Sequence, residues 1–158
     1  MSLKNLSVRN KIPNIYKSRL LNQRVNKIFK KFEKSFKINT NFIVGVSGGP
    51  DSLALAFLTK VYALKKNLNP RYFIVDHKLR KESTNEADKV KRVLKSLKIN
   101  AHVLTWKGKK PVNNIQSLAR NKRYELLFSK CKKLKISNLV LGHHLDDLIE
   151  NFFLRMAR

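Results

Sequence analysis

A short polar segment that follows an apolar run has the residue types needed to bind phosphate. The segment Ser47–Ser52 reads Ser-Gly-Gly-Pro-Asp-Ser and comes directly after Phe42–Val46. Gly48 and Gly49 can adopt positive φ angles, which lets backbone N–H groups approach an anion closely. Pro50 suits the first turn of a helix, whose N-terminus offers N–H groups and the positive end of the helix dipole. With the two serine hydroxyls as further donors, we predict a phosphate-binding loop.

Asp51 indicates what accompanies the phosphate. The segment is not a Walker A loop, because Pro50 and Asp51 stand where that motif, counted from Gly45, requires Gly and Lys. A carboxylate repels phosphate unless a cation lies between them, so Asp51 predicts a bound Mg²⁺ ion. The alternative is an ordinary glycine-rich turn in which Asp51 caps the following helix.

A second group of acids lies near the C-terminus. On a helix that begins near His143, this residue shares one face with Asp147 and Glu150. Two acids that converge near Asp51 could complete the Mg²⁺ site, with Asp147 as a ligand, or hold an amine. The alternatives are solvated acids on a helix surface, or a zinc or iron site, for which further His or Cys ligands are lacking nearby. The pattern does not decide between Asp146 and Asp147 as the metal ligand.

Asp76, Arg120 and Arg123 are three further candidates for contacts with a nucleotide or its phosphates. Asp76 ends an apolar run, which is the usual position of a carboxylate that contacts a nucleotide ribose. The alternative is that Asp76 caps the loop that follows. Arg120 and Arg123 share one face of a predicted helix, where they could bind phosphate together. The alternative is a pair of solvated arginines.

Alternating strands and helices must position these residues. Apolar runs predict strands at Phe42–Val46, Arg71–Val75, His102–Trp106 and Asn138–Leu141. Helices are predicted after the phosphate loop to about Lys66, over Thr84–Leu97 and Asn114–Leu134, and from Gly142 onward. This alternation indicates an α/β fold, with a parallel sheet and helices on both faces. Ligands of such sheets bind at the carboxyl ends of the strands, where each polar segment named above begins.

The charge of the chain favours a polyanionic partner. Its 158 residues include 35 Lys and Arg but 10 Asp and Glu, which gives a net charge of +25. This excess is typical of proteins that bind nucleic acid, although a genome-wide drift toward Lys would also produce it. Apolar residues recur at helical spacing from Tyr16 to Phe36. We predict a basic extension over residues 1–40 with one amphipathic helix, which either packs on the core or faces nucleic acid.

The composition excludes several classes of protein. A single cysteine excludes a disulfide scaffold and a four-cysteine zinc site. No apolar run approaches the roughly 18–20 residues of a membrane span, and no apolar signal segment follows the basic N-terminus. We therefore expect a cytoplasmic protein that does not bind membranes. No pattern in the sequence indicates the oligomeric state, and a homodimer is one possible state.

The segment Val44–Ser52 resembles the PP-loop of the N-type ATP pyrophosphatases. The resemblance implies a Rossmann-like fold of the adenine nucleotide alpha hydrolase type over residues 41–158. It also implies that ATP is split between its α and β phosphates. The residues implied to hold the pyrophosphate part of ATP are Ser47, Gly48, Gly49, Pro50, Asp51 and Ser52.

Further segments make the resemblance more specific, to the tRNA(Ile)-lysidine synthase family. The segments that resemble this family follow one another in the same order as in the family: Val44–Ser52, Val75–Arg80, Ile115–Tyr124 and Gly142–Arg155. That family activates the wobble cytidine of a CAU-anticodon tRNA(Ile) with ATP, and free L-lysine then displaces AMP to give lysidine. The resemblance implies ATP and Mg²⁺ as cofactors. It places Asp76, His77 and Arg120 near the nucleotide, and it implies catalytic roles for Asp51, Arg123, His143, Asp147 and Glu150.

The chain also departs from the family pattern. Lys78 stands where the family often has glycine, and the sequence ends at Arg158 where the family domain continues. We therefore expect the chain to correspond to the N-terminal part of the catalytic domain.

Three alternatives share parts of the pattern. A 2-thiocytidine synthase has the loop and a similar His-His segment, but it needs cysteines that Cys131 alone cannot supply. Ammonia-dependent amidoligases have the loop but do not call for so basic a surface. A non-catalytic module that binds ATP or RNA is the third alternative.

Overall fold

The computed structural model describes residues 12–108 and 115–142 of the chain. The predicted site residues His143, Asp146, Asp147 and Glu150 lie outside these ranges, as do residues 109–114. Within the described ranges, no helix is long and apolar enough to cross a membrane.

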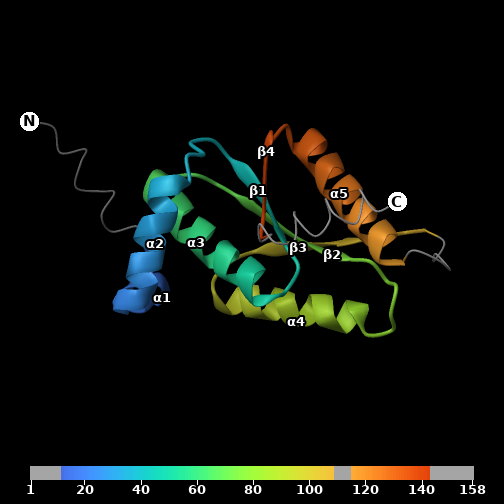
Figure 1. The fold of residues 1–158 in the computed structure, drawn as a ribbon, viewed down its shortest axis with the longest axis horizontal. Helices are drawn as coiled ribbons and strands as arrows, with labels where there is room; N and C mark the ends of the chain where they lie inside the picture. Colours follow the sequence, from blue (N-terminus) through green and yellow to red (C-terminus); the bar gives the residue numbers. More distant parts are fainter. Residues whose placement is uncertain (1–11, 109–114, 143–158) are drawn as a thin grey trace, which may run out of the picture.

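Four parallel strands form one sheet (Figure 1). They are β1 (Phe42–Val46), β2 (Arg71–Asp76), β3 (Ala101–Thr105) and β4 (Asn138–Leu141). The strand order is β3-β2-β1-β4, so the chain adds two strands on one side of β1 and then crosses to its other side. This reversal creates a switch point between β1 and β4, and open parallel sheets bind ligands at the carboxyl ends of strands beside such a point.

Helices cover both faces of the sheet, as predicted. On one face, α3 (Pro50–Lys66) and α4 (Ser83–Ser96) pack against inward residues of β1 and β2 such as Val44 and Ile74. On the other face, α5 (Ile115–Leu134) places Leu127 against Ile43 and its neighbours. Figure 1 shows the sheet between these two helical layers. Every residue of β1 is buried because strands flank it on both sides and helices cover both of its faces.

The N-terminal segment forms two helices, so the prediction of one continuous helix over Tyr16–Phe36 was wrong. The chain forms α1 (Asn14–Leu20) and α2 (Gln23–Ser35), with Asn22 between them in an extended conformation. The side-chain oxygen of Asn22 accepts hydrogen bonds from the N–H groups of Arg24 and Val25. An asparagine that caps a helix in this way starts a new helix rather than continuing the previous one.

Candidate nucleotide-binding site

A pocket of about 850 Å³ opens at the carboxyl ends of the strands. Its lining includes Gly45 and Val46 of β1, the last residues of β2, and both serines of the predicted phosphate loop, Ser47 and Ser52. Residues at the start of α4 form one wall, and residues of α5 form another. This volume is within the range of small-molecule sites, about 300–1,000 Å³.

The phosphate loop is organised by the hydroxyl of Ser52, which is 3% exposed. The Ser52 Oγ accepts hydrogen bonds from the Gly48 N–H at 3.0 Å and the Ser47 hydroxyl at 3.1 Å, and it donates to the Gly49 carbonyl at 2.9 Å. Ser52 therefore holds the loop in shape. Both serine hydroxyls that were expected to donate to phosphate, those of Ser47 and Ser52, therefore donate within the loop in this structure.

The two loop glycines differ in their backbone conformation. Gly48 has a φ of +94°, as predicted, and a β-carbon built there would collide with the side chain of Val90 on α4. Gly49 has a φ of −67°, and a β-carbon built there would lie 3.9 Å from the Ser47 Oγ, an ordinary contact distance, so the expectation of a positive φ holds for Gly48 alone. Gly49 is instead the N-cap of α3, and Pro50 occupies the first turn as expected.

Asp76 is buried at the end of β2, with 2% of its surface exposed. Its Oδ1 accepts hydrogen bonds from the Lys78 N–H and the Ser83 hydroxyl, both at 2.9 Å, and its Oδ2 accepts one from Thr84 at 2.8 Å. Burial acts to raise the pKa of Asp76, but these hydrogen bonds and the charge of Lys78 outweigh it and leave the pKa lowered. The capping role is thus observed, and the ribose contact stays a prediction.

Arg120 and Arg123 form a cationic wall of the pocket, and His77 lies in the same lining. The structure thus brings together three residues predicted to act on the nucleotide. Neither ring nitrogen of His77 has a hydrogen-bond partner among the residues described, although both are buried. Burial lowers the pKa of His77, and the charge of Arg123 lowers it further, against an opposing effect of Asp76. Burial also lowers the pKa of Arg123, with a smaller contribution in the same direction from Arg120.

The wall is built to receive an anion. Arg120 lies over the ring of Tyr124 at 5.9 Å, which orients its guanidinium. Neither arginine makes an ion pair with a carboxylate in the described part of the chain. A half-buried guanidinium without a carboxylate is stabilised by any anion that enters the pocket, because Coulomb attraction is stronger away from bulk water.

The predicted Mg²⁺ site is present only in part within the described ranges. Asp51 lies in the first turn of α3 and is exposed. Asp76 has both carboxylate oxygens occupied by hydrogen bonds, and no cluster of three or more His, Cys, Asp or Glu side chains occurs among the residues the structure describes. A single carboxylate such as that of Asp51 would hold Mg²⁺ only together with substrate phosphates, because the ion is usually bound by one or two carboxylates and the phosphates of the substrate.

Sequence reasoning missed two residues that shape the site. Val90 of α4 fills the space above Gly48, and Gly142 at the end of β4 lies so close to α3 that an added β-carbon would be 3.0 Å from the Ser52 Cα. Val90 shares the apolar face of α4 with Ala87 and Leu94, but nothing local in the sequence indicates which loop it covers. The glycine at position 142 was itself the available signal for a close backbone approach.

The comparisons with known proteins agree with this geometry. A family model described as a PP-loop domain matches residues 18–158. The chain belongs to the PP-loop domain family. The resemblance that the phosphate loop suggested is therefore confirmed at the level of the family.

Curated relatives with similar sequences share one name. The tRNA(Ile)-lysidine synthase of Orientia tsutsugamushi is 42% identical over 124 residues, which cover 78% of this PP-loop chain and 28% of that protein. The enzyme of the same name from Bartonella henselae is 40% identical over 118 residues, and that from Rickettsia bellii is 36% identical over 141. These matches cover 24% and 32% of the two proteins, so the chain spans about a quarter to a third of the length of its relatives.

Solved structures confirm the fold. The U34-tRNA thiolase NcsA from Methanococcus maripaludis, a structure with a [4Fe-4S] cluster, superposes with a TM-score of 0.71 at 21% identity, covering 86% of this PP-loop chain and 51% of that one. The NH3-dependent NAD synthetase from Campylobacter jejuni gives a TM-score of 0.50 at 20% identity over 85% and 58% of the two chains. The prediction of a parallel α/β fold with helices on both faces is confirmed.

Proposed function

We propose that this chain is the ATP-binding part of a tRNA(Ile)-lysidine synthase. In this proposal it adenylates the wobble cytidine of a CAU-anticodon tRNA(Ile), and free L-lysine then displaces AMP to form lysidine. The relatives at 36–42% identity carry that name, which supports the choice of reaction. The observation that carries the proposal is that Ser47 and Ser52 of the phosphate loop line the same pocket as Arg120 and Arg123 of α5.

The loop and the wall suit opposite sides of a polyphosphate. The first turn of α3 offers N–H groups and the positive end of the helix dipole, whereas the Gly48 N–H of the loop donates to Ser52. Arg120 and Arg123 of α5 face the same pocket and supply guanidinium groups. A triphosphate between them would be held by short-range hydrogen bonds on one side and by charge on the other. The apolar part of the pocket, which includes Leu79 and Ala87, is suited to an adenine ring.

The proposed reaction has two steps. The C2 oxygen of the cytidine attacks the α-phosphorus, and the bond from that phosphorus to the bridging oxygen breaks, so pyrophosphate leaves. The neutral amine of lysine then attacks C2, and AMP leaves with the original oxygen as the amine loses a proton. Charge that develops on the leaving pyrophosphate is stabilised by donors already aimed at it, in this case the loop and Arg123.

Other parts of the proposal rest on sequence alone. Mg²⁺ would accompany ATP and neutralise phosphate charge, with Asp51 and Asp147 as its protein ligands. Glu150 or His143 would steer the lysine amine or accept its proton. The positions of Asp147, Glu150 and His143 lie outside the described residues, and these roles stay predictions.

Binding of ATP tests the nucleotide site directly. Isothermal titration of the chain with Mg-ATP should give a saturable site, and Arg123→Gln should weaken binding by about tenfold or more, since a hydrogen bond to a charged group contributes about 1.5–3 kcal/mol. Arg92→Gln is the matched control, because Arg92 is exposed on α4 and does not line the pocket. Equal ATP affinities of the two variants would show that Arg123 of the cationic wall does not contact the nucleotide.

Release of AMP tests the reaction. α-Labelled ATP is incubated with the chain, Mg²⁺ and unmodified CAU-anticodon tRNA(Ile), with and without L-lysine. AMP release that requires both tRNA and lysine is the expected result. Release that requires tRNA but not lysine would indicate another tRNA-modifying reaction of the PP-loop class, and ATP binding without any AMP release would indicate a binding module.

A further inference from the structure

The outer face of α2 carries a continuous row of bases. Arg24, Lys27, Lys31 and Lys34 are all exposed, and their spacing of three, four and three residues places them on one side of the helix. We call these four residues the α2 ridge. Ten residues of α-helix separate its ends, so the ridge is about 15 Å long.

The ridge has no acidic partner in the described part of the chain. The one acid of α2, Glu33, is bound on the inner side of the helix by Lys65 at 2.6 Å. The first turn of α2 contains no acid, and there the charge of Arg24 adds to the positive end of the helix dipole. Like charges at these spacings repel one another by about 0.2–0.5 kcal/mol per pair. A polyanion on this face would relieve that repulsion.

We propose that the α2 ridge binds the phosphate backbone of an RNA. The choice of RNA rests on the proposed function, whereas the polyanionic character of the partner rests on the ridge itself. A row of exposed cations on the outside of a helix contacts phosphates and not base edges, so its binding does not depend on nucleotide sequence. Such contacts release counterions, and the affinity therefore falls steeply as the salt concentration rises. The ridge would therefore add affinity rather than sequence selection.

An anionic membrane is the other surface that a basic amphipathic helix can bind. Such binding requires the apolar face of the helix to enter the lipid. In α2 that face is occupied, because Phe29 is 3% exposed and packs with Val61 and Tyr62 of α3. Ile28 is the exposed large apolar residue of α2, which is too little apolar surface to anchor a helix. The packing thus favours RNA over lipid.

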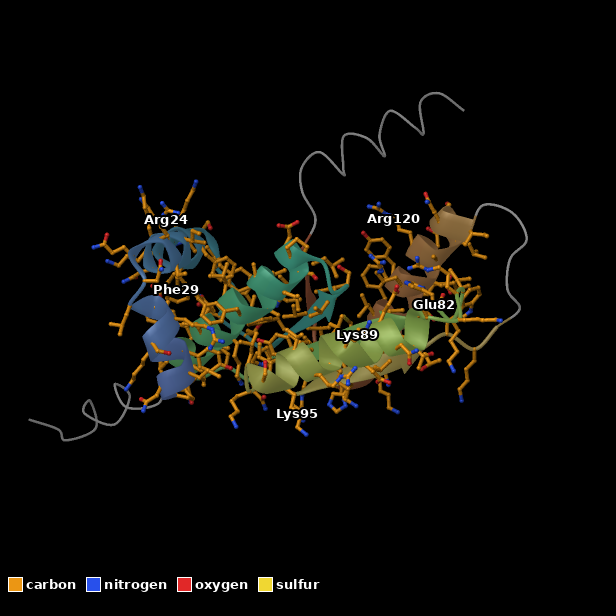
Figure 2. The ribbon with its side chains drawn as sticks, turned by 90° about the horizontal axis from the view of Figure 1, so that it is seen from below. Arg24, Phe29, Glu82, Lys89, Lys95 and Arg120 are labelled. Atoms are coloured by element: carbon orange, nitrogen blue, oxygen red, sulfur yellow. The ribbon has the colours of Figure 1, made fainter. Side chains whose placement is uncertain are left out.

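The ridge is separate from the nucleotide pocket. Lys65, which holds Glu33 of α2, lies in the last turn of α3, whereas the phosphate loop lies at the other end of that helix. A helix of 17 residues is about 25 Å long, so a mononucleotide cannot reach both places. Figure 2 shows Arg24 on α2 toward one end of the molecule and Arg120 on α5 toward the other. Substitution of the ridge should therefore leave ATP binding unchanged.

Two matched quadruple variants test the proposal. One replaces the ridge (Arg24→Gln, Lys27→Gln, Lys31→Gln, Lys34→Gln), and the control replaces one Arg and three Lys that are exposed on α4 (Lys89→Gln, Lys91→Gln, Arg92→Gln, Lys95→Gln). Both lower the net charge by four. Gln keeps helix propensity, and circular dichroism melts verify the fold of each variant. The α4 face is the suitable control because Asp88 lies among its bases.

The probe is a fluorescently labelled CAU-anticodon tRNA transcript, titrated by anisotropy from 50 to 200 mM salt. We expect the ridge variant to bind about tenfold or more weakly, with a slope of log K against log salt that is smaller by about 3, as four lost phosphate contacts require. The control variant should retain most of the wild-type affinity and slope.

Other outcomes overturn the proposal. Equal losses of RNA affinity in both variants would show that RNA binding depends on net charge and not on the ridge. Wild-type RNA affinity in the ridge variant, or no RNA binding by the wild-type chain, would exclude the ridge as an RNA-binding surface. Ridge-dependent binding to phosphatidylserine vesicles with unchanged RNA affinity would identify a membrane surface instead. ATP titrations distinguish this inference from the proposed function. If the chain binds RNA through the ridge but does not bind ATP, the proposed function fails and the RNA-binding role of the ridge stands.

Discussion

The side chain of Val90 on α4 occupies the space where a β-carbon on Gly48 would lie. The phosphate loop thus depends on a helix that begins more than thirty residues later in the chain. Gly48 also has a φ of +94°, which side chains rarely adopt. Conformation and packing therefore both require glycine at this position, whereas neither does so at Gly49.

Substitution of the two glycines should separate these requirements. Gly48→Ala is expected to lower the free energy of unfolding by about 2 kcal/mol and to abolish ATP binding, because strain and the collision with Val90 both displace the loop. Gly49→Ala should lose less stability, at most about 1 kcal/mol for the poorer N-cap, since its φ is −67° and the nearest atom is 3.9 Å from the added carbon. Urea unfolding and ATP titration measure the two effects. Similar losses in both variants would contradict the assigned role of Gly48.

Asp76 should stabilise the fold in a pH-dependent way. Its pKa is lowered below the ordinary value of 3.8, so the stabilisation is fully present above about pH 4 and is lost as the pH falls through the lowered pKa. Asp76→Asn replaces the carboxylate oxygen that accepts from Thr84 with an amide NH₂ group. The substitution should lower the free energy of unfolding by about 1–3 kcal/mol at pH 7. Urea unfolding of both proteins from pH 7 to pH 2.5 should show the difference narrowing below pH 4. A constant difference would exclude the carboxylate as its source.

His77 should also make stability depend on pH, but at a higher pH than Asp76 does. Burial and Arg123 lower its pKa below 6.5, so the unfolded chain binds more protons than the folded chain below that pH. Stability should therefore fall as the pH drops from about 6.5 toward the lowered pKa. His77→Gln should remove this part of the pH dependence, whereas His102→Gln, at an exposed position of β3, should retain it. Denaturant unfolding at pH 5 to 8 provides the comparison, and an unchanged slope in His77→Gln would contradict it.

Lys78 is a residue whose replacement should stabilise the protein. Its φ is +51°, a left-handed conformation that costs a side chain about 1–2 kcal/mol and glycine much less. Lys78→Gly should raise the free energy of unfolding by about 1 kcal/mol, which corresponds to about 2–4 °C in the melting temperature of a chain of this size. Lys81→Gly, in the same loop but without a positive φ, should not stabilise the fold. Scanning calorimetry distinguishes the two variants.

Much of the fold followed from local patterns. The apolar runs at Phe42–Val46 and Asn138–Leu141 became strands with the predicted bounds, because a short buried run between turn residues has few other conformations available. The phosphate loop was recognisable since its glycines, proline and serines each have a local physical role. The break at Asn22 was missed because the apolar spacing continues through it, and the capping asparagine competes with that spacing.

The sequence by itself determined the elements, the chemistry of the phosphate loop and the excess of positive charge, because these depend on neighbouring residues and on composition. The tertiary structure alone decided that β4 lies beside β1, that Val90 covers Gly48, and that His77 of the β2 end meets Arg123 of α5 in one pocket. It also decided that the apolar face of α2 is occupied by α3, which leaves its bases outward. Strand order and helix packing arise from long-range contacts among apolar surfaces of similar chemistry, and local periodicity does not distinguish one partner from another.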